Sequence, residues 1–156
     1  MTCVQQLKPR ILTSRKLMQG AAAVGLLITT GIVLLGVEPR PDSEIARGQK
    51  LYADHCASCH GSNLEGEPNW QSPKPNGRMP APPHNETGHT WHHSDRDLLL
   101  ITKKGLGAIV PGYMSDMPAF ENVLSDAEIA QVLAYIKSRW PEKARSYQQE
   151  RTRLKP

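Results

Sequence analysis

The run Cys56–His60, with the sequence CASCH, constrains this chain more than any other feature. Two cysteines separated by two residues and followed directly by histidine are typical of covalent haem attachment. Each thiol can form a thioether with a haem vinyl group, and the residue after the second cysteine then lies close to the iron. We therefore predict that Cys56 and Cys59 hold one haem c and that His60 is its proximal ligand.

Two other kinds of site use a Cys-x-x-Cys pair. A structural zinc site needs a second pair of ligands at matching spacing, and Cys3 is the only other cysteine. A thioredoxin-like redox motif belongs in a pattern of alternating strands and helices, which this sequence lacks. The residues therefore favour haem.

Charge is unevenly distributed along the 156 residues. The net charge of +4 comes entirely from residues 1–37, because 15 of the 19 basic residues lie beyond them and balance the 15 acidic ones. The basic character of the chain is thus no indication of nucleic-acid binding.

An uncharged stretch, residues 20–37, follows those basic residues. As a helix it would span ~27 Å, close to the thickness of a bilayer core. The positive-inside rule then keeps residues 1–19 in the cytoplasm and exports the rest. A cleaved secretory signal is the alternative, but the stretch is long for one and no clear cleavage site follows. The sequence favours a single-pass anchor in the cell membrane, with the remaining chain on the periplasmic or other extracytoplasmic side.

The exported part is expected to begin with a helix that is capped by Asp42 or Ser43 and runs to about His55. Gly48 and Tyr52 lie four residues apart and share one face of it. Glycine inside a helix is unfavourable by about 1 kcal/mol relative to alanine, so its presence indicates close approach of another helix.

Two further helices are expected. One covers about residues 94–104, with Ser94 as its cap and Gly105 at its end. The other follows the capping box Ser125–Glu128 and is stopped by Pro141. Its apolar face consists of Ile129, Val132, Leu133, Ile136 and Trp140.

No segment has a convincing strand pattern, so the predicted fold class is all-α. Residues 61–93 form a long loop rich in Pro, Gly and Asn, which we expect to wrap the haem edge. The charged tail is expected to be a frayed extension or a short helix. The predicted organisation is a basic N-terminus (1–19), an anchor (20–37), a proline-containing linker (38–42), a haem domain (43–140) and the tail (141–156).

The sixth position of the iron needs a second ligand, and methionine sulfur is the usual one in electron-transfer haems. Met117 begins the sequence MPAF in a Pro/Gly-rich loop before the last helix. Proline there stiffens the loop and helps hold a ligand in place. Met117 is the predicted distal ligand and Met114 is its main rival. Met79, in a similar Met-Pro-Ala-Pro sequence of the long loop, a histidine, or no protein ligand are the remaining alternatives.

These motifs together resemble those of class I c-type cytochromes, most closely the bacterial membrane-anchored monohaem type. The resemblance covers residues 43–140 and rests on three patterns, GxxxYxxxCxxCH (48–60), MPAF (117–120) and LSDxEI (124–129). It implies a small helical domain wrapped around one haem, with the first and last helices crossing. It also implies the same roles for Cys56, Cys59, His60 and Met117. The segment GHTWHH (88–93) departs from the plain class I pattern.

That segment and His84 make a histidine-rich region whose role is open. Imidazoles and nearby carboxylates are ligands for copper or zinc, but the spacing favours a polar loop near the haem propionates. Trp91 is a candidate pocket residue that would donate its indole N–H to a propionate or pack on the porphyrin edge, unless it is an ordinary buried tryptophan. Tyr52 is a second candidate pocket residue.

The leading functional hypothesis is an electron carrier, not an enzyme, that works between membrane redox complexes. A haem subunit or domain of a larger oxidoreductase would have the same sequence features. A peroxidase or gas sensor would require an open sixth position, and metal handling would require copper on the histidine-rich region.

Overall fold

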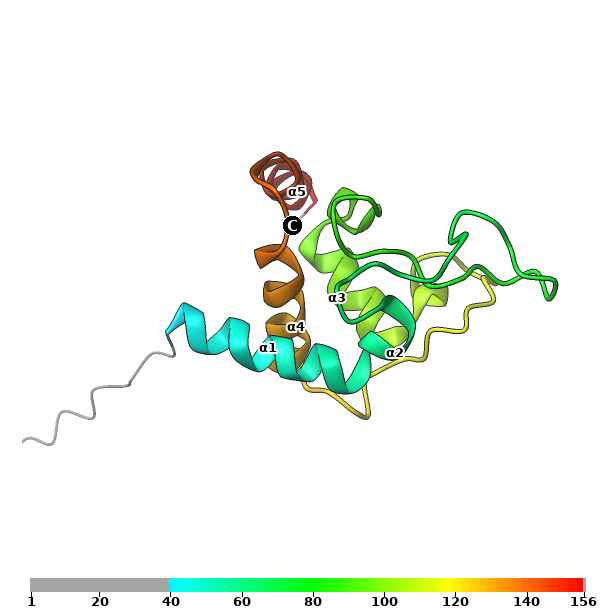
Figure 1. Ribbon diagram of the computed structural model, residues 1–156, viewed down its shortest axis with the longest axis horizontal. Coiled ribbons are helices and arrows are strands. Elements are labelled where there is room, and N and C mark those ends of the chain that lie inside the picture. The colour runs from blue at the N-terminus through cyan, green and yellow to red at the C-terminus, as the bar shows by residue number, and fades with distance from the viewer. Residues whose placement is uncertain (1–39, 156) are drawn as a thin grey trace, which may run out of the picture. The chain divides into compact units, whose positions relative to one another are not determined.

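The computed structural model describes residues 40–155, and all regular structure within them is helical (Figure 1). The elements are α1 (Pro41–His55), α2 (Ala57–His60), η1 (Thr90–His92), α3 (Asp95–Lys104), η2 (Leu106–Ala108), α4 (Asp126–Ser138) and α5 (Glu142–Leu154). The predicted all-α fold class is confirmed for this part of the chain. The predicted anchor, residues 20–37, lies outside the described residues, and no helix within 40–155 is long and apolar enough to cross a membrane.

Helices α1 and α4 cross in close contact, as Gly48 and Tyr52 predicted (Figure 1). A Cβ atom added to Gly48 would lie 1.9 Å from the carbonyl oxygen of Gln131 on α4. One turn later, the buried ring of Tyr52 lies 5.4 Å from that of Tyr135. The missing side chain at Gly48 therefore permits the two backbones to approach.

The predicted helix caps are present on α3 and α4. Ser94 Oγ accepts a hydrogen bond from the Asp97 N–H, and Gly105 ends α3 at a φ of +83°. Ser125 and Glu128 form both hydrogen bonds of a capping box on α4. These bonds satisfy N–H groups that have no partner inside the helix.

The predicted start of α1 was wrong by two or three residues. The helix begins at Pro41, Arg40 occupies the N-cap position without a side-chain cap, and the Ser43 hydroxyl instead donates to the Arg40 carbonyl. Proline is well suited to the first helical position, because its fixed φ is helical and no N–H is needed there.

The long loop, residues 61–93, folds back on itself and contains η1. The Glu67 N–H donates to the Ala81 carbonyl and the His84 N–H to the Leu64 carbonyl, each at 2.9 Å. Leu64 is also buried at 1% exposure, which ties the loop to the core. Its length is therefore compatible with an ordered structure.

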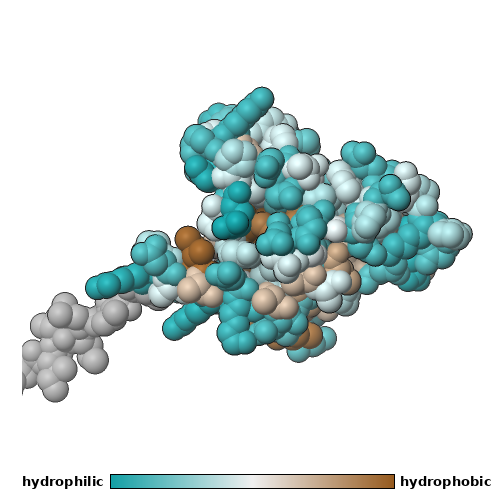
Figure 2. Space-filling view, in the orientation of Figure 1, coloured by the Kyte–Doolittle hydropathy of each residue, from teal (hydrophilic) through white to brown (hydrophobic). Residues whose placement is uncertain are grey.

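The charged tail forms helix α5 and not a frayed extension. Gln148 is buried and its side-chain amide lies 2.6 Å from Asp95 Oδ1 and 3.3 Å from the His93 carbonyl. The Arg151 guanidinium donates to the His92 carbonyl at 3.2 Å. Helix α5 thus holds η1 and the start of α3 through polar contacts. The visible surface around these elements is mostly hydrophilic as well (Figure 2).

We predict that Gly48→Ala lowers the free energy of unfolding of the haem-loaded protein by about 1–3 kcal/mol. The new methyl group would overlap the α4 backbone, which outweighs the better helix propensity of alanine. Urea denaturation measures the change, and Gln49→Ala, at an exposed neighbouring position, is the control. Equal stability of the two variants would contradict a tight crossing.

A second matched pair tests α5. Gln148→Ala should cost about 1–3 kcal/mol, because the hydrogen bonds of this buried amide to Asp95 and the His93 carbonyl are lost. Gln149→Ala, at the exposed neighbouring position, should have little effect. If thermal unfolding gave the same midpoint for both variants, the contact between α5 and η1 would be unimportant for stability.

Candidate haem site

Helix α1 ends directly before Cys56, and the single turn of α2 contains Cys59 and His60. Cys56 is partly buried, Cys59 is exposed, and both are free thiols. Burial raises the pKa of the Cys56 thiol to about 11, with a further contribution from Cys59. A reactive Cys-x-x-Cys pair has a lowered thiol pKa, so this environment does not favour a thioredoxin-like site.

His60 is buried at 7% exposure and held by a single backbone carbonyl. Its Nδ1 lies 2.8 Å from the carbonyl oxygen of Pro82. A carbonyl only accepts, so Nδ1 carries the proton and Nε2 keeps a free lone pair. Burial lowers the pKa of His60, partly offset by the bond to Pro82, and so favours the neutral imidazole that binds a metal.

A cavity of about 360 Å³ adjoins this motif, a size in the usual range for ligand sites. Cys56, Cys59 and His60 line part of it. The apolar walls come from α3, α4 and the segment before α4, through Leu98, Ile101, Phe120, Val132, Leu133 and Ile136. Apolar walls next to two thiols and a neutral imidazole fit a covalently attached porphyrin.

The three methionines of the described region are placed differently. Met117 lines the cavity and packs against the buried core. Met79 also lines the cavity. Met114 is 66% exposed and is not part of the cavity wall.

The two further candidate pocket residues do not line the cavity. Tyr52 lies in the α1–α4 crossing, and its hydroxyl donates to the Gly61 carbonyl at 2.8 Å, directly after His60. Trp91 packs edge-on against Tyr147 of α5 at 5.3 Å. Its indole N–H is buried and is without a hydrogen-bond partner among residues 40–155. Tyr52 therefore supports the main chain next to His60, whereas Trp91 packs against the core and α5.

The histidine-rich region lies partly at the cavity. His84, His89 and His93 line it, and the rings of His89 and His93 are 5.5 Å apart. His84 stacks on His60 at 4.0 Å, and burial, followed by the effect of His60, lowers its pKa well below the usual value. Within the described chain, no group of three or more His, Cys, Asp or Glu side chains is arranged to hold a metal ion.

Sequence reasoning missed two supporting residues and left the role of a third open. Pro82, which acts through a main-chain oxygen, and Trp70, which stacks on His89 at 5.5 Å, were missed. His84, which stacks on His60, was named only as part of the histidine-rich region. Met79 was named only as a lesser candidate ligand in the long loop, yet all four residues of the Met79–Pro82 segment line the cavity. Its run of prolines was the available signal of a rigid wall.

Known proteins with similar sequences include two oxidase subunits. Over 105 residues the chain is 29% identical to the Cbb3-type cytochrome c oxidase subunit FixP of Bradyrhizobium sp. (strain ORS 278), covering 67% of this chain and 31% of the relative. Over 109 residues it is 27% identical to the Cbb3-type cytochrome c oxidase subunit CcoP of Rhodobacter capsulatus, covering 69% and 33%. The chain thus spans about a third of the length of these relatives. No solved structure matches it.

The family model for cytochrome c matches residues 45–140, which contain the cysteine motif, the cavity walls and Met117. This range agrees with the resemblance derived from the motifs and covers more than half of the chain. The match implies covalently bound haem c and electron transfer through it. The chain belongs to the cytochrome c family.

Proposed function

We propose that this chain is a single-haem electron carrier in which Cys56 and Cys59 hold haem c and His60 and Met117 ligate its iron. The observation that carries the proposal is that His60, with Nε2 free, and Met117 line the same apolar cavity. When bound there, the haem supplies one-electron chemistry between its ferric and ferrous forms. The sequence contains a single Cys-x-x-Cys-His motif, which supports one haem.

The surrounding residues have distinct roles in this proposal. The Pro82 carbonyl fixes the orientation of His60 and increases the basicity of its imidazole. The apolar side chains of α3 and α4 exclude water and lower the local dielectric, which affects the reduction potential. A methionine sulfur as the second ligand would favour the ferrous form.

Met117 is favoured over the other two methionines by its surroundings. Its sulfur-bearing side chain packs against the core, and Pro118 stiffens the segment that carries it. Met114 is mostly exposed. Met79 lies three residues before Pro82, in the same segment that supports the proximal histidine. Met79 would thus bring its sulfur from the segment that already holds His60 through Pro82, whereas Met117 comes from a segment of its own before α4.

Two protein ligands would leave the iron without an open position. Such a centre transfers electrons through the haem edge and does not bind peroxide or oxygen as a substrate. The proposed chain is therefore a carrier and not a peroxidase or gas sensor.

We infer that its partners are membrane redox complexes. The relatives are subunits of cbb3-type oxidases, which supports a partner of this class. The proposed anchor at residues 20–37 would confine the domain to the extracytoplasmic side of the cell membrane and raise its effective concentration near such complexes. A haem subunit of a larger oxidoreductase is the alternative form of this function, because the oxidase relatives are themselves subunits.

The axial ligands are tested by absorption spectra of the full chain, produced in cells that attach haem. The ferric protein should be low-spin and show a sulfur-to-iron charge-transfer band. Met117→Ala should abolish that band, whereas Met114→Ala and Met79→Ala should retain it. A high-spin spectrum that changes on addition of peroxide would instead indicate an open sixth position and an enzyme or sensor.

The covalent attachment is tested by denaturing electrophoresis with haem staining. Wild-type protein and Cys3→Ser should retain one haem per chain, because Cys3 lies outside the motif. Cys56→Ser with Cys59→Ser should release it, since both thioether bonds are then absent. Haem that stays attached to the double variant would contradict the assignment.

A further inference from the structure

Lys74 and Arg78 flank a tight turn in the long loop. The Lys74 N–H donates to the Arg78 carbonyl and the Gly77 N–H to the Lys74 carbonyl, each at 2.8 Å. Gly77 has a φ of +79°, a conformation that glycine adopts without strain. The turn therefore holds two cationic side chains close together.

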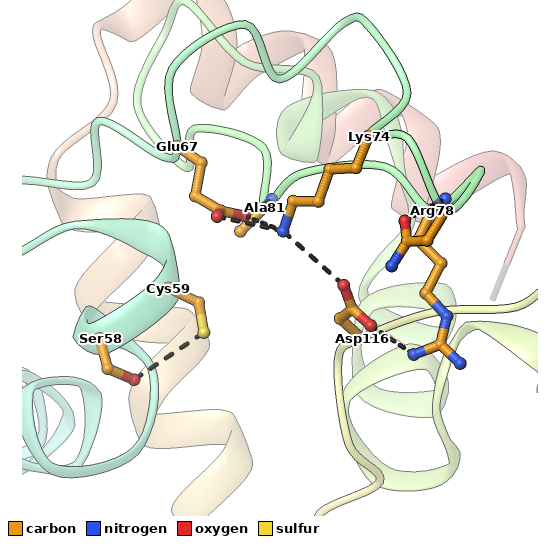
Figure 3. Close-up of polar contacts among 8 residues, drawn as sticks. Ser58, Cys59, Glu67, Lys74, Arg78, Ala81 and Asp116 are labelled. Atoms are coloured by element: carbon orange, nitrogen blue, oxygen red, sulfur yellow. Dashed lines mark hydrogen bonds and ion pairs between the residues drawn. The ribbon is translucent and has the colours of Figure 1, made fainter.

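Both cations reach Asp116, which belongs to a different part of the chain (Figure 3). Arg78 Nη1 lies 2.5 Å from Asp116 Oδ1, and Lys74 Nζ lies 3.7 Å from Asp116 Oδ2. Asp116 directly precedes Met117 in sequence. On the other side of Met117, the Phe120 N–H donates to the Thr102 carbonyl of α3 at 3.1 Å. The segment that carries Met117 is thus attached on both sides.

Glu67 links the Lys74–Arg78–Asp116 contacts to the side of the cavity where His60 lies. Its carboxylate accepts from Lys74 Nζ at 3.1 Å and from the Ala81 N–H at 2.6 Å (Figure 3). Ala81 precedes Pro82, whose carbonyl holds His60. A continuous set of polar contacts therefore joins the support of the proximal histidine to the residue beside Met117. Three of its charged members, Glu67, Lys74 and Asp116, line the cavity.

We propose that this ionic bridge, formed by Glu67, Lys74, Arg78 and Asp116, positions Met117 and sets how readily its sulfur leaves the iron. The proposal rests on the proposed function, in which Met117 is the distal ligand. The members of the bridge are positioning residues, because they act on the ligand through the segment that carries it. Their side chains are 33–43% exposed, so added salt weakens the bridge by screening its charges.

The test measures how fast carbon monoxide replaces the methionine sulfur in the ferrous, haem-loaded full chain. At saturating carbon monoxide the observed rate is the rate at which the sulfur leaves. Carbon monoxide is uncharged, so salt affects the protein and not the approach of the probe. The wild-type rate should rise with salt. Asp116→Asn should raise it about five-fold at low salt and remove the salt dependence, as expected for the loss of two exposed ion pairs.

Two further variants make the test specific. Arg78→Gln combined with Asp116→Asn should be no faster than Asp116→Asn alone, because both changes remove the same contact. Lys103→Gln breaks a comparably exposed ion pair with Asp126, at 2.6 Å, and should keep the wild-type rate. The ferric sulfur-to-iron band should persist in every variant, which shows that the site is still folded.

The outcomes separate this proposal from the one on which it rests. An unchanged rate in Asp116→Asn with an intact band overturns the bridge and leaves the proposed function standing. An equal acceleration by Lys103→Gln overturns it too, because the effect would then be general loosening. A wild-type protein that lacks the band overturns the distal role of Met117 and the bridge together.

Discussion

The contact on which the other features depend is the crossing of α1 and α4 at Gly48. Because that residue has no side chain, the helix backbones meet closely enough for Tyr52 and Tyr135 to pack in the next turn. The crossing fixes the position of the C-terminal end of α1 relative to α4, and the cysteine motif begins directly after that end. The same helix α4 then supplies one wall of the cavity. Helix packing therefore determines the distance between the cysteine motif and the apolar wall of the cavity.

Much of the cavity is built from chain without regular secondary structure, which is stable because its polar groups are paired internally. The loop 61–93 bonds to itself through main-chain groups and reaches the core through Leu64. Helix α5 then supports the far end of that loop at η1. The family match ends at residue 140, yet packing continues through α5, so the folded unit is larger than the region shared with the family.

The sequence predicted the features that depend on local chemistry. The cap at Ser125, the glycine contact at Gly48 and the cysteine motif each follow from a few adjacent residues, and the structure contains the first two as predicted. Long-range contacts were not predictable in the same way. The Pro82 carbonyl has no side-chain signature, and Trp91 faces α5 because distant residues fold against it. The packed state of α5 was also hidden, since its few buried residues do not form an apolar stripe.

The hydrogen bond between His60 and Pro82 has consequences for which properties of this protein can change during evolution. Its acceptor belongs to the main chain, so no amino-acid replacement at position 82 deletes that oxygen. In the proposed carrier, a side-chain replacement at position 82 therefore leaves in place the acceptor that makes the proximal imidazole a stronger electron donor to the iron. Adjustment of the reduction potential to a new donor or acceptor would have to come from elsewhere, through the polarity of the walls or the geometry of the sulfur ligand.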